Sequence, residues 1–337
     1  MEASLIPPSP EWYLKVQEPV IDPTRPIVDS HHHLWREDEF GYDYLLPDLH
    51  NDTNSGHNIV KTVFVNCRTN YWDSGPNHLR PVGETEFIAN ISKTQNHTSG
   101  AKISAIIGHA DLALGAAVEE VLEAHESAGH GLFRGIRHSL AYSPGKGFLM
   151  FPGRAPAELS RNKDFRNGVR RLGECHYIYE TYHFYDQNNE FLELAKYAPE
   201  TTMVLNHLGT PWGTDNFRYL RDEIFSIWRS DITALSECPN VYIKLGGLAM
   251  PDAGFNWHIR SKPATSDEIV KAHQRYYLHA IEAFGPDRCM FESNFPVDKL
   301  SVSYSVLINA FKKMILDLSD IDKDALFFNT ASYVYGI

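Results

Sequence analysis

From residue 27 onward, short apolar runs alternate along the chain with longer segments whose apolar residues are three or four positions apart. Short runs of this kind are typical of buried strands, and strands that alternate with helices are typical of parallel βα units. The pattern predicts eight strands, at residues 27–32, 59–67, 102–109, 132–138, 177–184, 201–207, 241–246 and 288–293. Eight such units favour an α/β fold of the (β/α)8, or TIM, barrel type.

The segments between these strands carry one apolar face at helical spacing. Such faces occur at Val118, Val121, Leu122 and His125, at Phe217, Leu220, Ile224, Phe225, Trp228 and Ile232, and at Val306, Ala310, Phe311 and Met314. In a barrel these faces would cover the outside of the sheet, and the last of them follows the eighth strand, as closure requires. We therefore predict a single barrel domain over residues 27–337, with residues 1–26 as an N-terminal extension packed on it.

Composition narrows the class of protein. A chain of 337 residues with 43% hydrophobic content can form one large core, and its net charge of −12 argues against nucleic-acid binding. No apolar run is long enough to span or anchor in a membrane, and residues 1–26 lack the features of an export signal. The cysteines are far apart and form no CxxC pair, which predicts a reduced, cytoplasmic protein; they are Cys67, Cys175, Cys238 and Cys289.

Three consecutive histidines end the first predicted strand, in the stretch Asp29-Ser30-His31-His32-His33. Because alternate side chains of a strand share a face, Asp29, His31 and His33 are expected to project together, and His32 to point the other way. Two imidazoles at this spacing can hold a divalent metal or polarise a substrate oxygen.

Polar residues recur at the C-terminal ends of most of the predicted strands, where barrel enzymes gather their catalytic groups. They are His31 and His33, His109, Arg137 and His138, Tyr182 and His183, Asn206 and His207, Lys244, and Glu292, Ser293 and Asn294. Each alone has an ordinary structural explanation, and Lys244 equally suits a buried cation paired with a carboxylate. Their recurrence at one end of the barrel favours an active site. The long segments 33–58 and 139–162 are candidate walls of its pocket.

Several of these stretches, in this order, resemble the amidohydrolase superfamily, in the branch of L-fuconolactonase-like and 2-pyrone-4,6-dicarboxylate lactonase-like enzymes. They are residues 28–35 (VDSHHHLW), 133–138 (FRGIRH), 205–211 (LNHLGTP), 241–248 (VYIKLGGL), 290–297 (MFESNFPV) and 328–332 (FNTAS). The resemblance implies a distorted (β/α)8 barrel of the metal-dependent-hydrolase type. It also implies hydrolysis of lactones or related esters and amides, with decarboxylases in the wider group. His31 and His33 match the family's HxH pair, His207 matches its sixth-strand histidine, and Arg137 with His138 match residues near the substrate.

The eighth strand departs from the family pattern, in which an aspartate binds metal or activates water. Here the stretch reads Glu292-Ser293-Asn294, so an amide stands at the aspartate's place. An amide cannot act as a general base, whereas a carboxylate can. Glu292, two residues earlier and expected on the same strand face, is the candidate replacement.

The leading hypothesis is a hydrolase that opens a small cyclic ester or a related ester or amide, with an anionic or aromatic organic substrate. Arg137 would hold an anionic group, and Glu292, or else His183, would activate water. His31, His33 and His207 would either bind one zinc ion or polarise the carbonyl directly, and the residues leave this choice open. The other candidates are Asn294 for catalysis, and for substrate binding Trp35, His138, Tyr182, His183 and Lys244.

Two alternatives remain open at this stage. Asn294 in place of an aspartate suits a decarboxylase or another C–C lyase, which needs charge stabilisation more than a strong base. A catalytically inactive barrel that binds a ligand or a partner is the second alternative. Assembly into a homo-oligomer is compatible with every one of these hypotheses.

Overall fold

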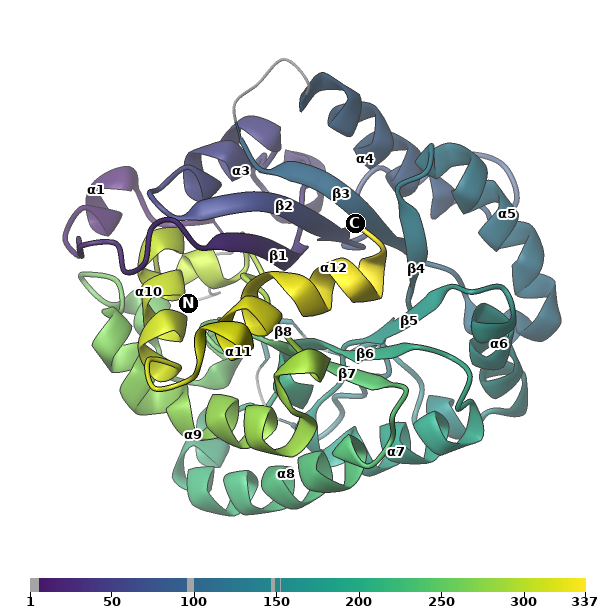
Figure 1. Cartoon of the computed structure of the whole chain (residues 1–337). Coiled ribbons are helices and arrows are strands. Elements are labelled where there is room, and N and C mark those ends of the chain that lie inside the picture. The colour runs from purple at the N-terminus through teal and green to yellow at the C-terminus, as the bar shows by residue number, and fades with distance from the viewer. Residues whose placement is uncertain (1–5, 96–99, 147–148, 152) are drawn as a thin grey trace.

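The computed structural model describes residues 6–95, 100–146, 149–151 and 153–337. Eight parallel strands stand side by side in chain order and curl into a barrel, and helices surround it (Figure 1). The strands are β1 Pro26–His32, β2 Asn58–Val65, β3 Lys102–Gly108, β4 Phe133–Arg137, β5 Ile178–Thr181, β6 Met203–Leu205, β7 Val241–Leu245 and β8 Cys289–Phe291. All eight coincide with predicted strands, so the (β/α)8 fold is confirmed.

The helices that cover the barrel are amphipathic, as the spacing predicted. In α5, Val118, Val121, Leu122 and His125 are buried, and α10 buries its predicted apolar face in the same way. The helices are α1 Pro10–Tyr13, α2 Glu37–Phe40, α3 Leu46–Thr53, α4 Val82–Thr94, α5 Val118–Gly129, α6 Lys163–Glu174, α7 Asn188–Tyr197, α8 Arg221–Ser236, α9 Ser266–Phe284, α10 Tyr304–Met314, α11 Asp320–Asp324 and α12 Thr330–Tyr335. Within the described residues, no helix combines the length and apolar character needed to cross a membrane.

The barrel closes where the chain after β8 meets β1. The amide of Asn294 donates to the carbonyl of His31 at 2.9 Å, and the amide of His33 donates to the carbonyl of Phe295 at 2.8 Å. The pairing of β1 with β2 shifts register between Asp29 and His32. Closure therefore takes place at the same residues that the sequence singled out for chemistry.

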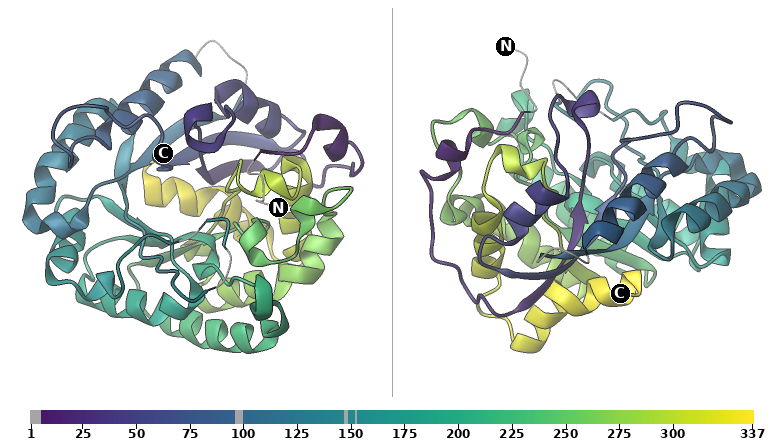
Figure 2. Two further views of the ribbon diagram at one scale, coloured as in Figure 1. Left: turned by 180° about the vertical axis from the view of Figure 1, so that it is seen from behind. Right: turned by 90° about the horizontal axis from the view of Figure 1, so that it is seen from above.

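The C-terminal helix α12 covers the end of the barrel at which the strands begin. It crosses that end in Figure 1 and lies behind the strands in the left view of Figure 2. Arg134, near the start of β4, donates from Nε to the carbonyl of Tyr335 at 2.7 Å. Tyr335 and Ala331 pack against Val28 and other apolar side chains of the strands. The opposite end, where the strands finish, is left for a functional site.

The N-terminal segment lies along the side of the barrel near α9 and α10. Trp12 donates from its indole nitrogen to the carbonyl of Arg260 at 2.8 Å, and Tyr13 donates to the carbonyl of Lys299 at 2.7 Å. Asn309 of α10 accepts from the amide of Ile21 at 3.0 Å. These contacts hold the described part of the N-terminal segment against the chain around α9 and α10.

Tyr335 links the C-terminal helix to a buried charge inside the barrel. Its hydroxyl donates to Oε1 of Glu180 at 2.5 Å, and both side chains are fully buried. Because Tyr335→Phe leaves a buried carboxylate oxygen without this donor, we expect it to lower the free energy of unfolding by about 1–3 kcal/mol. Urea denaturation measures this change. The control is Tyr333→Phe on the same helix, where the ring is 77% exposed and the stability should stay nearly constant.

Candidate active site

A cavity of about 480 Å³ opens at the end of the barrel where the strands finish. Its volume suits a small organic ligand. Most of the site residues that the sequence predicts line this cavity: His33, Trp35, Arg137, His138, Tyr182, His207 and Asn294. His31 and Glu292 are fully buried and do not line it.

The three predicted histidines meet at the floor of the cavity. Nε2 of His31 lies 3.3 Å from Nε2 of His33, and the rings of His31 and His207 have centroids 4.7 Å apart. They come from the ends of β1 and β6, so the fold brings together residues far apart in the sequence. His33 and His207 are only 4% and 3% exposed, which limits the water that reaches the cluster.

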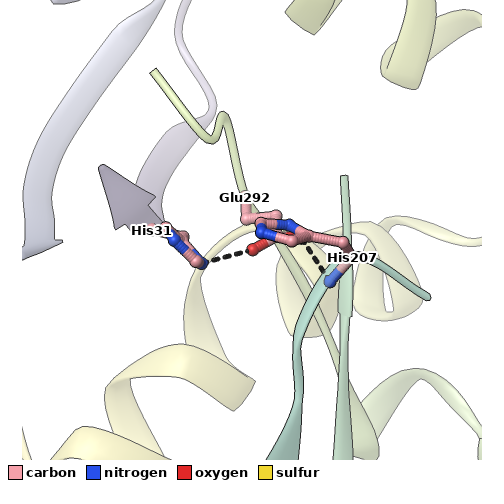
Figure 3. Close-up of side chains that lie close together, drawn as sticks. All are labelled: His31, His207 and Glu292. Atoms are coloured by element: carbon pink, nitrogen blue, oxygen red, sulfur yellow. Dashed lines mark hydrogen bonds and ion pairs between the residues drawn. The ribbon is translucent and has the colours of Figure 1, made fainter. Parts of the chain in front are cut away.

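The carboxylate of Glu292 lies behind two of these imidazoles and joins them (Figure 3). Its Oε1 accepts from the backbone amide of His207 at 2.9 Å and from Nδ1 of the same residue at 2.7 Å. Its Oε2 lies 2.8 Å from Nδ1 of His31. This contact between Oε2 and Nδ1 is at ion-pair distance but lacks the orientation of a hydrogen bond. Among the described residues, neither Oε2 of Glu292 nor Nδ1 of His31 therefore has a hydrogen-bond partner. Glu292 therefore fixes the tautomer of His207, whose Nε2 keeps its lone pair.

His31 and His33 are held in the neutral state. Burial lowers the pKa of both imidazoles well below the ordinary value; the charge of Lys244 adds to the effect at His31, and that of Arg137 at His33. The Nδ1–H of His33 donates to the carbonyl of Val65 at 2.8 Å, which leaves a lone pair on Nε2. Neutral imidazoles with free lone pairs are the form that binds metals or accepts protons.

His31 provides a test of whether a cation fits here. If its proton is on Nε2, the lone pair of Nδ1 faces the carboxylate oxygen of Glu292 at 2.8 Å. If its proton is on Nδ1, the lone pair of Nε2 faces that of His33 at 3.3 Å. The first tautomer brings two acceptors together, and in the second the lone pair of Nε2 is shared between His33 and a guanidinium nitrogen of Arg137 at 3.3 Å. A divalent cation among these atoms would relieve the repulsion between the acceptors.

The structure offers two overlapping ligand sets for such a cation. His31, His207 and Glu292 have ligand atoms that all lie within 4.8 Å of one another. The sequence predicted His31, His33 and His207, and the free Nε2 of His33 remains close to that of His31. Imidazole nitrogens with or without one carboxylate are ligands that suit zinc. The residues present therefore fit a zinc ion.

Arg137 lies beside the histidine cluster on the cavity wall. One guanidinium nitrogen is 3.3 Å from Nε2 of His31, and the other donates to the carbonyl of Asn66. His138, the next residue, accepts at Nδ1 from the amide of Leu112 at 3.1 Å, and burial lowers its pKa to about 3. His138 is therefore neutral with its proton on Nε2, where it can serve as a hydrogen-bond donor.

Asn294, which stands where the family pattern has an aspartate, also lines the cavity. Its Nδ2 donates to Oδ1 of Asp298 at 2.9 Å. This bond fixes the amide, so that its oxygen is the polar atom left for other contacts. Burial raises the pKa of Asp298 well above the ordinary value, but Asp298 does not line the cavity.

The long segments predicted as pocket walls contribute to the cavity. Trp35 is nearly parallel to the ring of His33, with centroids 6.1 Å apart, and packs on Phe40. Tyr182 donates from its hydroxyl to the carbonyl of Phe151 at 3.0 Å, which attaches the second segment to β5. Residues 147–148 and 152 of that segment lie outside the described residues.

Two predicted substrate-binding residues lie away from the cavity. Lys244 is fully buried and bonds to Oε2 of Glu180 at 2.7 Å, which agrees with the alternative of a buried structural cation. His183 is fully buried, with Nε2 3.0 Å from Oδ1 of Asn188 and its ring against Phe191. Neither contacts the space that a substrate could occupy.

Asp29 does not share a face with His31 and His33, so that expectation is wrong. Its carboxylate accepts from the amide of Ser293 and from the hydroxyl of Tyr304 in α10, both at 2.8 Å. The physical reason is the register shift between Asp29 and His32, which breaks strict alternation along β1. His32 stays out of the cavity, as predicted.

Sequence reasoning missed several residues that line the cavity, among them Asn66, Arg68, Ser139 and Arg154. Asn66 and Arg68 closely follow the end of β2, so the rule that strand ends carry the chemistry could have found them. Arg154 stands in the long segment after β4, where no periodic pattern marks a position as inward-facing.

Comparison with known proteins agrees with this arrangement. A model of the amidohydrolase family matches residues 28–337. The chain belongs to the amidohydrolase family. An uncharacterized protein, y4mH, of Sinorhizobium fredii is 32% identical in an alignment of 333 residues that covers 92% of this chain and 98% of the relative.

Two further relatives come from Burkholderia multivorans. An L-fucono-1,5-lactonase is 25% identical over 323 residues, covering 92% of this chain and 96% of the relative. The crystal structure of an amidohydrolase with bound zinc superposes with a TM-score of 0.72 at 24% identity, covering 92% of this chain and 99% of the other. The second comparison supports the fold.

His183 allows a test of its structural role. Burial lowers its pKa to about 4 from an ordinary 6.5. Between these two pH values the unfolded chain binds a proton at this histidine, whereas the folded chain does not. The stability of the wild type relative to His183→Gln should therefore fall as the pH drops from 6.5 to 4, by about 3 kcal/mol at most. Parallel denaturation of both proteins across this range measures the difference. This role is contradicted if the free energy of unfolding has the same pH dependence in both proteins, or if the variant loses most of its activity at pH 7.

Proposed function

We propose that this protein hydrolyses a small anionic cyclic ester, or a related ester or amide. The observation that carries the proposal is His207, which lines the cavity and is held by Glu292 from behind. An imidazole whose Nδ1–H is bound by a buried carboxylate is the arrangement that general-base catalysis requires. The L-fucono-1,5-lactonase relative supports a lactone as the substrate.

The charge of the cavity supports an anionic substrate. Among the described residues, its lining contains Arg68, Arg137 and Arg154 and no aspartate or glutamate. The chain as a whole has a net charge of −12, so this excess of positive charge is local to the cavity. Arginine binds carboxylates through paired, charge-assisted hydrogen bonds.

The reaction can be followed through the chain's own residues. Nε2 of His207 takes a proton from water, and the resulting hydroxyl attacks the carbonyl carbon of the substrate. Arg137 and the Nε2–H of His138 stabilise the negative charge that develops on the carbonyl oxygen. The carbon–oxygen bond of the ring then breaks, and His207 returns the proton to the leaving oxygen, so that one water is added overall.

In this scheme Glu292 acts through His207 rather than on water. Both its oxygens face imidazoles, and the side chain is fully buried outside the cavity. Its negative charge stabilises the imidazolium that forms when His207 accepts the proton. The earlier hypothesis of direct water activation by Glu292 is thereby replaced by a positioning role.

His31, His207 and Glu292, or His31, His33 and His207, would hold a zinc ion, and His207 would then be a metal ligand in place of the base. A bound zinc ion supplies Lewis-acid polarisation of the carbonyl and acidifies a bound water. Because burial keeps His31 and His33 neutral, no proton has to leave these imidazoles before they bind metal.

One observation favours a second candidate function, decarboxylation or another C–C bond cleavage. The group that β8 presents to the cavity is the amide of Asn294, and the nearby carboxylate of Glu292 is engaged by two histidines. A site of arginines and neutral histidines can stabilise a carbanion or an enolate without a free carboxylate base. Release of carbon dioxide without uptake of water would distinguish this reaction.

The experiment is a screen of the purified enzyme against five- and six-membered lactones, with and without a carboxylate group. Proton release in a weakly buffered indicator solution reports ring opening, and mass spectrometry identifies a product heavier by one water. Hydrolysis of carboxylated lactones supports the proposal. Carbon dioxide release supports the second candidate, and turnover of neither substrate class contradicts both.

The pairing of His207 with Glu292 leads to a specific prediction. Glu292→Gln keeps an acceptor but removes the charge that stabilises the imidazolium, so kcat should fall by about 10²-fold or more with a smaller change in KM. His207→Ala should lower kcat at least as far. The control is His183→Gln, which lies away from the cavity and should retain kcat. Retention of kcat in Glu292→Gln would assign Glu292 to folding alone.

Metal content gives an independent prediction. The fit of the donor atoms predicts about one equivalent of zinc per chain in protein prepared without chelators, measured by elemental analysis. His31→Ala removes a member of both ligand sets and should lower the bound zinc strongly. The comparison of His33→Ala with Glu292→Gln then identifies the third ligand. An equal zinc content in wild type and His31→Ala would exclude this site.

A further inference from the structure

The loop that follows β2 holds an arginine in a strained backbone conformation. Arg68 has a φ of 75° and Asn70 a φ of 51°, both in the left-handed region. A left-handed conformation is uncommon for a residue other than glycine, asparagine or aspartate, and costs about 1 kcal/mol or more. The surrounding structure must stabilise this turn at Arg68.

Glu84 of α4 supplies that support. Its Oε1 accepts from the amide of Cys67 at 2.9 Å and from the amide of Thr69 at 3.0 Å, so it binds the amides on both sides of Arg68. Its Oε2 accepts from the side-chain amide of Asn66. Glu84 is fully buried, and burial raises its pKa to about 7. Three hydrogen bonds hold this buried carboxylate in place, and two of them fix the backbone on either side of Arg68.

The packing of the loop on α4 is equally close. A Cβ on Gly83 would approach the carbonyl oxygen of Asn70 to 2.6 Å and the amide of Trp72 to 2.7 Å. Only glycine therefore fits at this position beside the loop. The consecutive residues Gly83 and Glu84 together determine where the turn at Arg68 lies.

The turn presents the side chain of Arg68 to the cavity. Arg68 is exposed and lines the cavity. Among the described residues, its guanidinium forms no hydrogen bond or ion pair, in contrast with Arg137, which contacts His31 and Asn66 at the floor. The cavity therefore has Arg137 near the histidine cluster, and Arg68 and Arg154 on two separate, more exposed segments.

We infer that Arg68 is a specificity-determining residue that binds a second anionic group of the substrate, away from the bond that reacts. Glu84 is its positioning residue. The substrate class is then an organic molecule with two anionic oxygen groups, such as a dicarboxylate. This inference rests on the proposed function for its anionic substrate, but it concerns binding and can be tested without turnover.

The test compares benzoate with the 1,2-, 1,3- and 1,4-benzenedicarboxylates by isothermal titration at fixed ionic strength and pH 7.5. The wild type should bind at least one dicarboxylate about tenfold more tightly than benzoate. Arg68→Asn removes the charge but tolerates the left-handed backbone, and it should abolish this preference while affinity for benzoate stays nearly constant. Arg68→Lys should retain part of the preference, because lysine lacks the planar fork.

The control is Arg229→Ala, on the outer helix α8, where the arginine is exposed and does not line the cavity. It makes the same change in net charge and should retain the full preference. Glu84→Ala should lose the preference as Arg68→Asn does, and the double variant should lose no more than either single variant. Rescue by Glu84→Gln, whose amide oxygen can still accept from both backbone amides, would separate positioning from folding.

The inference is overturned if the wild type shows no preference among these acids, if none of them binds, or if Arg68→Asn keeps the preference. Failure of the proposed function has a different signature. A preference that depends on Arg68, together with no hydrolysis of any ester, would contradict the hydrolase and leave this binding role intact.

Discussion

The contact on which the site depends is the buried carboxylate of Glu292 between His31 and His207. It joins the ends of β1, β6 and β8, which are distant in the sequence. The contact exists only because the barrel closes through the amides of His33 and Asn294, which bring the chain after β8 against β1. Barrel closure and assembly of the histidine cluster are therefore the same structural event.

Buried charges beneath the site connect it to the closed end of the barrel. Beneath the histidines, Lys244 and Glu180 form a fully buried ion pair, and Tyr335 of α12 donates to the same carboxylate. Removal of one partner from a buried pair leaves an uncompensated charge and is strongly destabilising. Since Lys244 also contributes to lowering the pKa of His31, the charge balance at the closed end affects the protonation of the open end.

The sequence predicted the eight strands, and most of the site residues that it predicts line the cavity, because both depend on local patterns, apolar runs and polar strand ends. It could not place Asp29, because a register shift in β1 reverses the face of a side chain without any local signal. The role of Glu292 was equally hidden, since a carboxylate near histidines can contact water or the imidazoles, and only the closed barrel decides. Arg68 lies three residues beyond the end of β2, in a turn fixed by Glu84 of α4.

The acidic groups near the site have a common arrangement that explains its chemistry. Glu292, Glu84 and Asp298 are fully buried, and each binds side chains or amides behind the cavity without lining it. The proposed substrate anion would therefore meet arginines as the charged groups of the described lining, and no carboxylate there repels it. The negative charge needed to orient the imidazoles is kept within the protein, where the low dielectric strengthens its effect on them. This separation allows one small cavity both to attract an anion and to hold its imidazoles in a fixed orientation.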